Sequence, residues 1–238
     1  DISFVACSRW LCDNARKASL LQNSDVSNIP NPIDTNFWKP QNKQEVRKMF
    51  RFPEKRKLLL FVADNVSDTR KGIAYLYEAL KILELKKADL IEKMSLVILG
   101  KRSREVLLQS PFHTIPMGYL SDAKQICRLY SAVDLFVTPS LEDNLPNTVM
   151  EAMACGCPVV GFRIGGIPEM IDHLQNGYVA ESRSSADLAK GIEEILFSEN
   201  YFYYSTQARL KVQQSYAEPY IARQYMDLYQ KLLDKKYE

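Results

Sequence analysis

Asp143 and Glu151 are the residues of this sequence best placed to do chemistry, because they lie on either side of an expected helix start. We expect that helix to begin at Pro146, since proline suits a first helical position, where its missing N–H would have no partner. The first N–H groups of a helix are unpaired and carry partial positive charge, so such an end accepts phosphate readily.

Carboxylates beside a phosphate site need another task, and hydrogen bonding to sugar hydroxyls is the obvious one. The alternative is structural. Asp143 or Asn144 would then only cap the helix, and Glu151 would be a solvated helix residue.

Two apolar runs enclose this helix and position its start. Residues 134–138 precede the loop and residues 158–162 follow the helix, and both runs indicate buried strands. Gly156 ends the helix and Pro158 prevents its return. The result is a βαβ unit whose polar loop lies at the carboxyl end of the first strand, where open α/β sheets bind ligands.

The rest of the chain repeats this alternation. We therefore predict an α/β fold, a Rossmann-like parallel sheet with helices on both faces. Ser121 is the expected cap of its helix. Residues 2–7 form an isolated strand before a helix capped by Ser8, and residues 26–29 form a second extended piece. The expected strands cover 57–63, 94–99, 112–117 and 177–180, and the expected helices cover 45–50, 72–87, 101–108, 121–131, 185–197, 201–216 and 219–235.

A second polar loop, residues 64–72, follows the strand at 57–63 and carries Arg70 and Lys71. From the residues alone, we expect both side chains only to solvate the loop.

Composition excludes several classes of protein. The net charge of +2 leaves no nucleic-acid footprint, and no apolar run reaches the length of a transmembrane helix. The five cysteines are scattered without a Cys-x-x-Cys pair, so we expect reduced thiols in a cytoplasmic protein. The chain has no dinucleotide-binding Gly-x-Gly-x-x-Gly, no P-loop and no Asp-x-Asp pair for a divalent ion. We expect no metal and no cofactor.

The central stretch resembles the signature of the retaining, nucleotide-sugar-dependent glycosyltransferases of family 4, which have the GT-B fold. Asp143 is followed by seven residues, Glu151 and then Ala-Met-Ala-Cys-Gly-Cys-Pro-Val-Val up to Val160. The family usually has Glu in the first position. Here Asp143 stands there with Glu142 one step earlier, which leaves open which carboxylate takes the first role.

The resemblance implies a role for each site residue. The catalytic set is Asp143, Glu151 and Lys71, with Asp143 or Glu142 orienting the sugar and Glu151 binding the ribose hydroxyls. The family Arg is absent, because Asp64 and Asn65 stand where it is expected, so Arg70 is the substitute. The implied donor-binding residues are Arg70 with Lys71 on the diphosphate, Glu142, the amides of Asn144 and Leu145, the Thr148 hydroxyl, Met117 and Gly118 against the base, and Glu169 on the loop or a sugar hydroxyl.

The resemblance also implies that this chain is the C-terminal half of a longer GT-B enzyme. Residues 1–34 would end the N-terminal acceptor domain and include the linker, 35–217 would bind the nucleotide sugar, and 218–238 would be the crossover helix. The implied partners are a nucleotide-diphospho-sugar donor, the missing acceptor domain and an acceptor at a membrane surface. The expected setting is bacterial polysaccharide biosynthesis in the cytoplasm, at the inner face of the membrane through the missing domain. We expect the fragment alone to be inactive.

Two other functions remain open from the sequence. One is a sugar-nucleotide epimerase or phosphorylase on a related fold. The other is a non-catalytic relative that binds nucleotide sugars.

Overall fold

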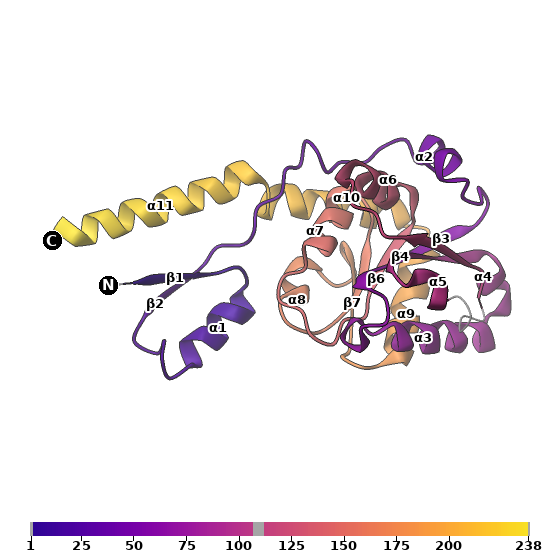
Figure 1. The fold of residues 1–238 in the computed structure, drawn as a ribbon, viewed down its shortest axis with the longest axis horizontal. Coiled ribbons are helices and arrows are strands. Elements are labelled where there is room, and N and C mark those ends of the chain that lie inside the picture. The colour runs from indigo at the N-terminus through magenta and orange to yellow at the C-terminus, as the bar shows by residue number, and fades with distance from the viewer. Residues whose placement is uncertain (1, 107–111, 238) are drawn as a thin grey trace.

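The computed structural model describes residues 2–106 and 112–237, and these form a six-stranded parallel sheet at the centre of the molecule (Figure 1). The strand order is β5-β4-β3-β6-β7-β8, with every neighbouring pair parallel. The predicted α/β fold is therefore confirmed. The strands are β3 (Lys57–Asn65), β4 (Met94–Lys101), β5 (Thr114–Gly118), β6 (Leu135–Thr138), β7 (Val159–Phe162) and β8 (Gly177–Ala180).

Helices cover both faces of this sheet because its strands are apolar on both sides. In β3, Leu58 and Leu60 join one apolar core while Leu59 and Phe61 join the other, and all four are buried. Each such side chain contributes about 1.5–3 kcal/mol when it is fully buried. One face packs against α2 (Lys43–Phe50), α6 (Ala123–Ala132), α7 (Asn147–Ala154) and α10 (Tyr201–Ser215), and the other against α3 (Ile73–Lys86), α4 (Ala88–Glu92) and α9 (Ser185–Leu196).

Most predicted elements differ from the observed ones only by a few terminal residues, but the cap of α6 was predicted wrongly. Asp122, not Ser121, is the N-cap, and its carboxylate accepts the Lys124 N–H at 2.9 Å. Asp122 is the cap because its side chain reaches the free N–H of the first turn. The expected helix at 101–108 appears as α5 (Ser103–Val106), and its last two positions lie outside the described residues.

The amino-terminal unit comprises β1 (Ser3–Ala6), α1 (Arg9–Lys17) and β2 (Asp25–Asn28). The prediction of an isolated first strand is wrong, because β1 pairs in parallel with β2. The predicted cap is confirmed, since the Ser8 hydroxyl accepts the Leu11 N–H at 3.0 Å.

The residues that follow the amino-terminal unit are hydrogen-bonded to the start of the final helix, α11 (Glu218–Tyr237). The Ile33 N–H donates to the Tyr216 carbonyl at 2.9 Å, and the Ile33 carbonyl accepts the Glu218 N–H at 3.2 Å. Figure 1 shows α11 and the amino-terminal unit extending from the same side of the main body.

Two findings concern classes of protein. All five cysteines are free thiols, as expected. Among the described residues, no helix combines the length and apolarity needed to cross a bilayer.

Candidate functional site

The site lies where the sheet changes its direction of growth. From β3 the chain adds β4 and β5 on one side, and from β6 it adds β7 and β8 on the other. The loops after β3 and β6 therefore diverge from adjacent strands and leave a crevice at their carboxyl ends. A short 3₁₀ helix, η1 (Thr69–Lys71), shapes the first of these loops.

Gly72 lets the two loops approach each other closely. Its φ of 71° is left-handed, and an added Cβ would lie 1.9 Å from the Pro139 carbonyl oxygen. The Arg70 carbonyl also accepts the Leu141 N–H at 2.7 Å. Only glycine combines this φ with this contact at low cost. The β3 loop is thus fixed against the β6 loop.

Lys71 and Asp143 meet across this junction. The Lys71 ammonium lies 2.8 Å from Asp143 Oδ2, and the two side chains are 32% and 18% exposed. Asp143 Oδ1 also accepts the Asn144 N–H at 3.1 Å. A partly dehydrated ion pair of this kind is held more firmly than one on the open surface. Two of the three predicted catalytic residues are therefore in direct contact.

A cavity of about 990 Å³ opens beside this ion pair. Its size is at the upper end of the range for small-molecule sites. Five of the lining residues are charged, so the cavity suits a polar ligand. The lining residues are Trp10, Arg70, Lys71, Leu141, Glu142, Asp143, Asn144, Arg163, Ile164, Gly165 and Pro168.

Two arginines of the cavity are paired with nearby carboxylates. Arg70 Nη2 lies 2.8 Å from Asp68 Oδ2, and Arg163 Nε lies 3.1 Å from Glu181 Oε1. The hydrogen bond from Arg70 lowers the pKa of the Asp68 carboxyl. Both guanidinium groups are more than half exposed, so each can turn toward an anion in the cavity.

Helix α7 starts one residue later than predicted. Pro146 is the N-cap, with φ −67° and an extended ψ of 120°, and Asn147 is the first helical residue. The prediction was wrong because it used only the φ of proline, which suits both positions. Leu145 is buried in the core, and Thr148 lies half-buried in the first turn.

Glu151 lies on α7 and faces α6. Its Oε2 accepts the Tyr130 hydroxyl at 3.3 Å. Burial raises the pKa of Glu151 to about 7, although the Tyr130 hydrogen bond acts in the opposite direction. Glu151 is not one of the described residues that line the large cavity. This carboxyl is therefore poised between its neutral and ionised forms at neutral pH.

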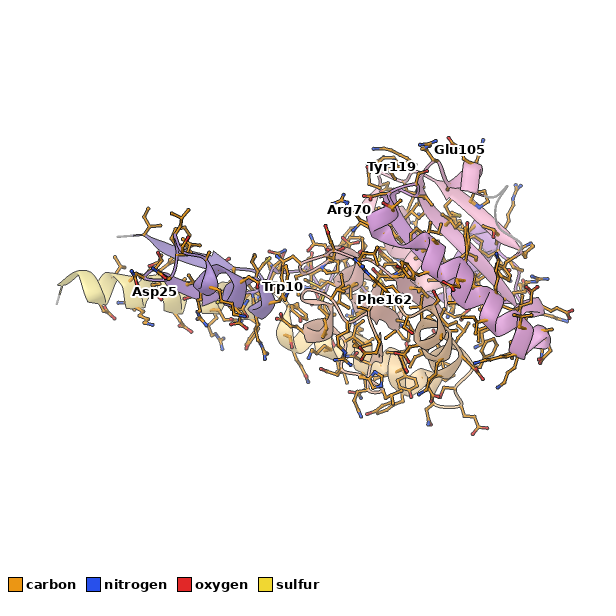
Figure 2. The ribbon with its side chains drawn as sticks, turned by 90° about the horizontal axis from the view of Figure 1, so that it is seen from below. Trp10, Asp25, Arg70, Glu105, Tyr119 and Phe162 are labelled. Atoms are coloured by element: carbon orange, nitrogen blue, oxygen red, sulfur yellow. The ribbon has the colours of Figure 1, made fainter. Side chains whose placement is uncertain are left out.

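Met117 and Gly118 line a separate cavity of about 340 Å³ at the carboxyl ends of β4 and β5. The Gly118 N–H donates to the Ser103 hydroxyl at 3.1 Å, and a Cβ added at Gly118 would meet no atom within 4 Å. The Lys101 ammonium lies 5.1 Å from the centroid of the exposed Tyr119 ring. Figure 2 shows Arg70 and Tyr119 on the same side of the main body.

Glu169 lies on α8 (Ile167–Met170) and contacts the amino-terminal unit. Its two carboxylate oxygens accept the N–H groups of Arg9 and Trp10, each at 2.9 Å. A carboxylate is favourable there because these N–H groups begin α1. The predicted sugar hydroxyl would have to share Glu169 with them.

Asn144 also joins the amino-terminal unit to the site. Its Oδ1 accepts the Ser8 hydroxyl at 2.5 Å, and its Nδ2 donates to the Cys7 sulfur at 3.0 Å. Gly166 packs against the same loop, with its N–H donating to the Asn144 carbonyl at 2.5 Å. Ser8, Asn144 and Glu169 thus hold α1 over the cavity.

Trp10 and Arg163 are cavity residues that the sequence reasoning missed. Arg163 directly follows β7, so a search for cations at the carboxyl ends of the predicted strands would have found it. Trp10 had no such signal, because its place depends on the docking of α1. Within residues 2–106 and 112–237, no three His, Cys, Asp or Glu side chains are grouped to hold a metal ion.

Comparison with known proteins matches residues 42–213 to the model of the family "Glycosyl transferases group 1". N-acetyl-alpha-D-glucosaminyl L-malate synthase of Bacillus anthracis is 25% identical over 214 residues, which are 89% of this chain and 55% of that protein. The chain thus spans about half the length of the curated relatives it matches.

Solved structures share the fold at lower identity. Sucrose-phosphate synthase of Thermosynechococcus elongatus superposes with a TM-score of 0.81 at 22% identity, over 97% of this chain and 58% of that one. Anabaena Alr3699/HepE, crystallised with UDP and glucose, gives a TM-score of 0.75 at 19% identity, over 96% of this chain and 63% of that one.

Proposed function

The chain belongs to the glycosyl transferases group 1 family, and on this basis we propose that it is the donor-binding half of a retaining glycosyltransferase. The observation that carries the proposal is the Lys71–Asp143 pair beside a polar cavity at the switch point of the sheet. The complex of the Anabaena neighbour with UDP supports a nucleotide-diphospho-sugar as the donor.

In this proposal, the cations of the β3–α3 loop hold the diphosphate. Lys71 is paired with Asp143, so a diphosphate competes with that carboxylate for the ammonium. When the diphosphate takes Lys71, Asp143 becomes available to accept a sugar hydroxyl. Arg70 leaves Asp68 to add a second cation, and Glu142 remains the other candidate for orienting the sugar.

Glycosyl transfer breaks the bond between the anomeric carbon and the diphosphate oxygen, and negative charge grows on the departing diphosphate. Once the cations contact the bound diphosphate, they stabilise that charge without further movement, and removing one such group costs about 3 kcal/mol of barrier. We expect Lys71, Arg70, the first amides of α7 and the Thr148 hydroxyl to supply this stabilisation without a metal.

The remaining parts of the donor extend away from the diphosphate. We place the base in the smaller cavity at Met117 and Gly118, and the ribose hydroxyls at Glu151. The amides of Asn144 and Leu145 lie beside the sugar. The acceptor that receives the sugar enters from the side of the amino-terminal unit.

Calorimetric titration of this chain with UDP, GDP and ADP and their sugar conjugates, in EDTA, tests the proposal. One nucleotide should bind without metal, and Lys71→Ala should weaken it about 10- to 100-fold, the effect of losing one charged hydrogen bond. Lys93→Ala is the matched control, because Lys93 is also ion-paired, with Asp89, but precedes the amino end of β4.

Equal binding by Lys71→Ala and Lys93→Ala would remove Lys71 from the site. If no nucleotide bound to the wild-type chain, the donor-binding proposal would fail for this half of the protein. Transfer of the bound sugar to an acceptor by the longer protein then separates a transferase from a non-catalytic relative.

A further inference from the structure

Trp10 is a large aromatic side chain that remains 45% exposed while lining the cavity. It belongs to the first turn of α1, in the amino-terminal unit, whereas the diphosphate-binding cations belong to the β3–α3 loop. Figure 2 shows Trp10 at the junction between that unit and the main body. It thus supplies an aromatic wall from a different element than the proposed diphosphate site.

The backbone of Trp10 is held firmly in this position. Its N–H donates to Glu169 at 2.9 Å, and Ser8 fixes the preceding turn through Asn144. None of these contacts uses the indole ring. The structure therefore positions the ring by its backbone and leaves its surface available to a ligand.

The other residues that line this cavity define the chemistry of that ligand. Glu142 and Arg163 line the same cavity, and both can hydrogen-bond hydroxyl groups. An alkyl chain would leave these charged groups unpaired, which is costly. A phosphate alone would gain little from the indole. A sugar ring fits both, since it has an apolar C–H face and a rim of hydroxyls, and aromatic faces attract polarised C–H groups.

We infer that Trp10 is the stacking platform of a carbohydrate subsite, and that the acceptor of this protein is itself a glycan. This inference rests on the proposed function, which assigns Lys71 and Asp143 to the donor and leaves the Trp10 wall to the acceptor. Trp10 is a positioning residue here, because it orients a sugar without taking part in bond breaking.

The chain offers a direct optical test, because it contains two tryptophans and the other, Trp38, packs against the core. In Trp38→Phe, the indole emission comes from Trp10 alone. We would titrate this variant with the methyl β-glycosides of glucose, galactose and N-acetylglucosamine. Each titration is done with and without the nucleotide that binds in the calorimetric titration. Sorbitol is the control, because it has similar hydroxyls and no ring.

The expected result is a saturable change in Trp10 emission with at least one glycoside and none with sorbitol. Calorimetry on Trp10→Ala should show glycoside affinity lowered about 10-fold, and Trp10→Phe should recover most of it, as expected for a ring contact of about 1 kcal/mol or more. Nucleotide affinity should fall by less than about 3-fold in Trp10→Ala.

Absence of a saturable response to every glycoside, or an equal response to sorbitol, would overturn the inference and leave Trp10 as a packing surface for another part of the protein. A larger loss of nucleotide affinity than of glycoside affinity in Trp10→Ala would overturn it too, by moving Trp10 to the donor site. Failure of the proposed function is read separately, as absence of nucleotide binding to wild type.

Discussion

Replacing Glu151 by Gln should remove a pH dependence from the stability of this fold. Burial raises the pKa of Glu151 from its ordinary 4.5 to about 7 in the folded state. Between these two values the folded protein keeps a proton that the unfolded chain has released. The free energy of unfolding therefore falls as the pH rises through this window. A difference of about 2.5 pKa units corresponds to about 3 kcal/mol.

Glutamine keeps the shape and an acceptor for the Tyr130 hydroxyl, but it does not ionise. Urea unfolding of wild type and Glu151→Gln, from about pH 5 to about pH 8, measures the effect. The stability difference between variant and wild type should grow by about 2–3 kcal/mol over this range, mostly below pH 7, and level off above it. Subtracting the free energies of unfolding of the two proteins at each pH cancels the contributions of the other titrating groups.

Glu92→Gln is the matched control, because Glu92 is an exposed carboxylate at the end of α4. Its difference from wild type should stay flat over the same pH range. A flat difference for Glu151→Gln as well would show that Glu151 is not buried as described, and it would refute the reasoning.

Two further changes test how the site is built. Gly72→Ala should destabilise the fold by about 2 kcal/mol or more, since a Cβ there meets the Pro139 carbonyl, whereas Gly118→Ala has a similar positive φ in open space and should cost only about 1 kcal/mol. Urea midpoints compare the two, and equal losses would mean that the loops do not touch. Asp134→Ala should cost about 3–5 kcal/mol by the same measurement, because Asp134 is the buried partner of Arg47 at 2.6 Å, and a loss below about 1 kcal/mol would contradict that pairing.

The sequence predicted the parts of the site that follow from strand order. Lys71 follows β3 and Asp143 follows β6, and parallel strands bring such loops to one edge of the sheet. Apolar runs and helical periods were enough to locate the strands and helices, because the core residues repeat at the spacing of each element. That the two residues pair required only that β3 and β6 be neighbours.

Other parts depend on tertiary contacts that no local pattern encodes. The roles of Glu169 and Trp10 arise because α1 docks on α8, far away in the sequence. The pairing of β1 with β2 depends on the return of the chain after α1. The environment of Glu151 comes from Tyr130 on the neighbouring helix, so a pattern that predicts a helix gives no sign of its burial.

In the proposed function, a ligand explains Glu151 better than the fold does. Glutamine would accept the Tyr130 hydroxyl equally well and would avoid the cost of ionising a buried carboxyl at neutral pH. The fold alone therefore favours glutamine at this position. An ionised carboxylate differs in offering two acceptor oxygens, as two neighbouring hydroxyls of a ribose require. A residue that lowers stability near neutral pH, one helix turn from the amino end of α7, fits the general rule that strongly shifted pKa values gather at functional sites.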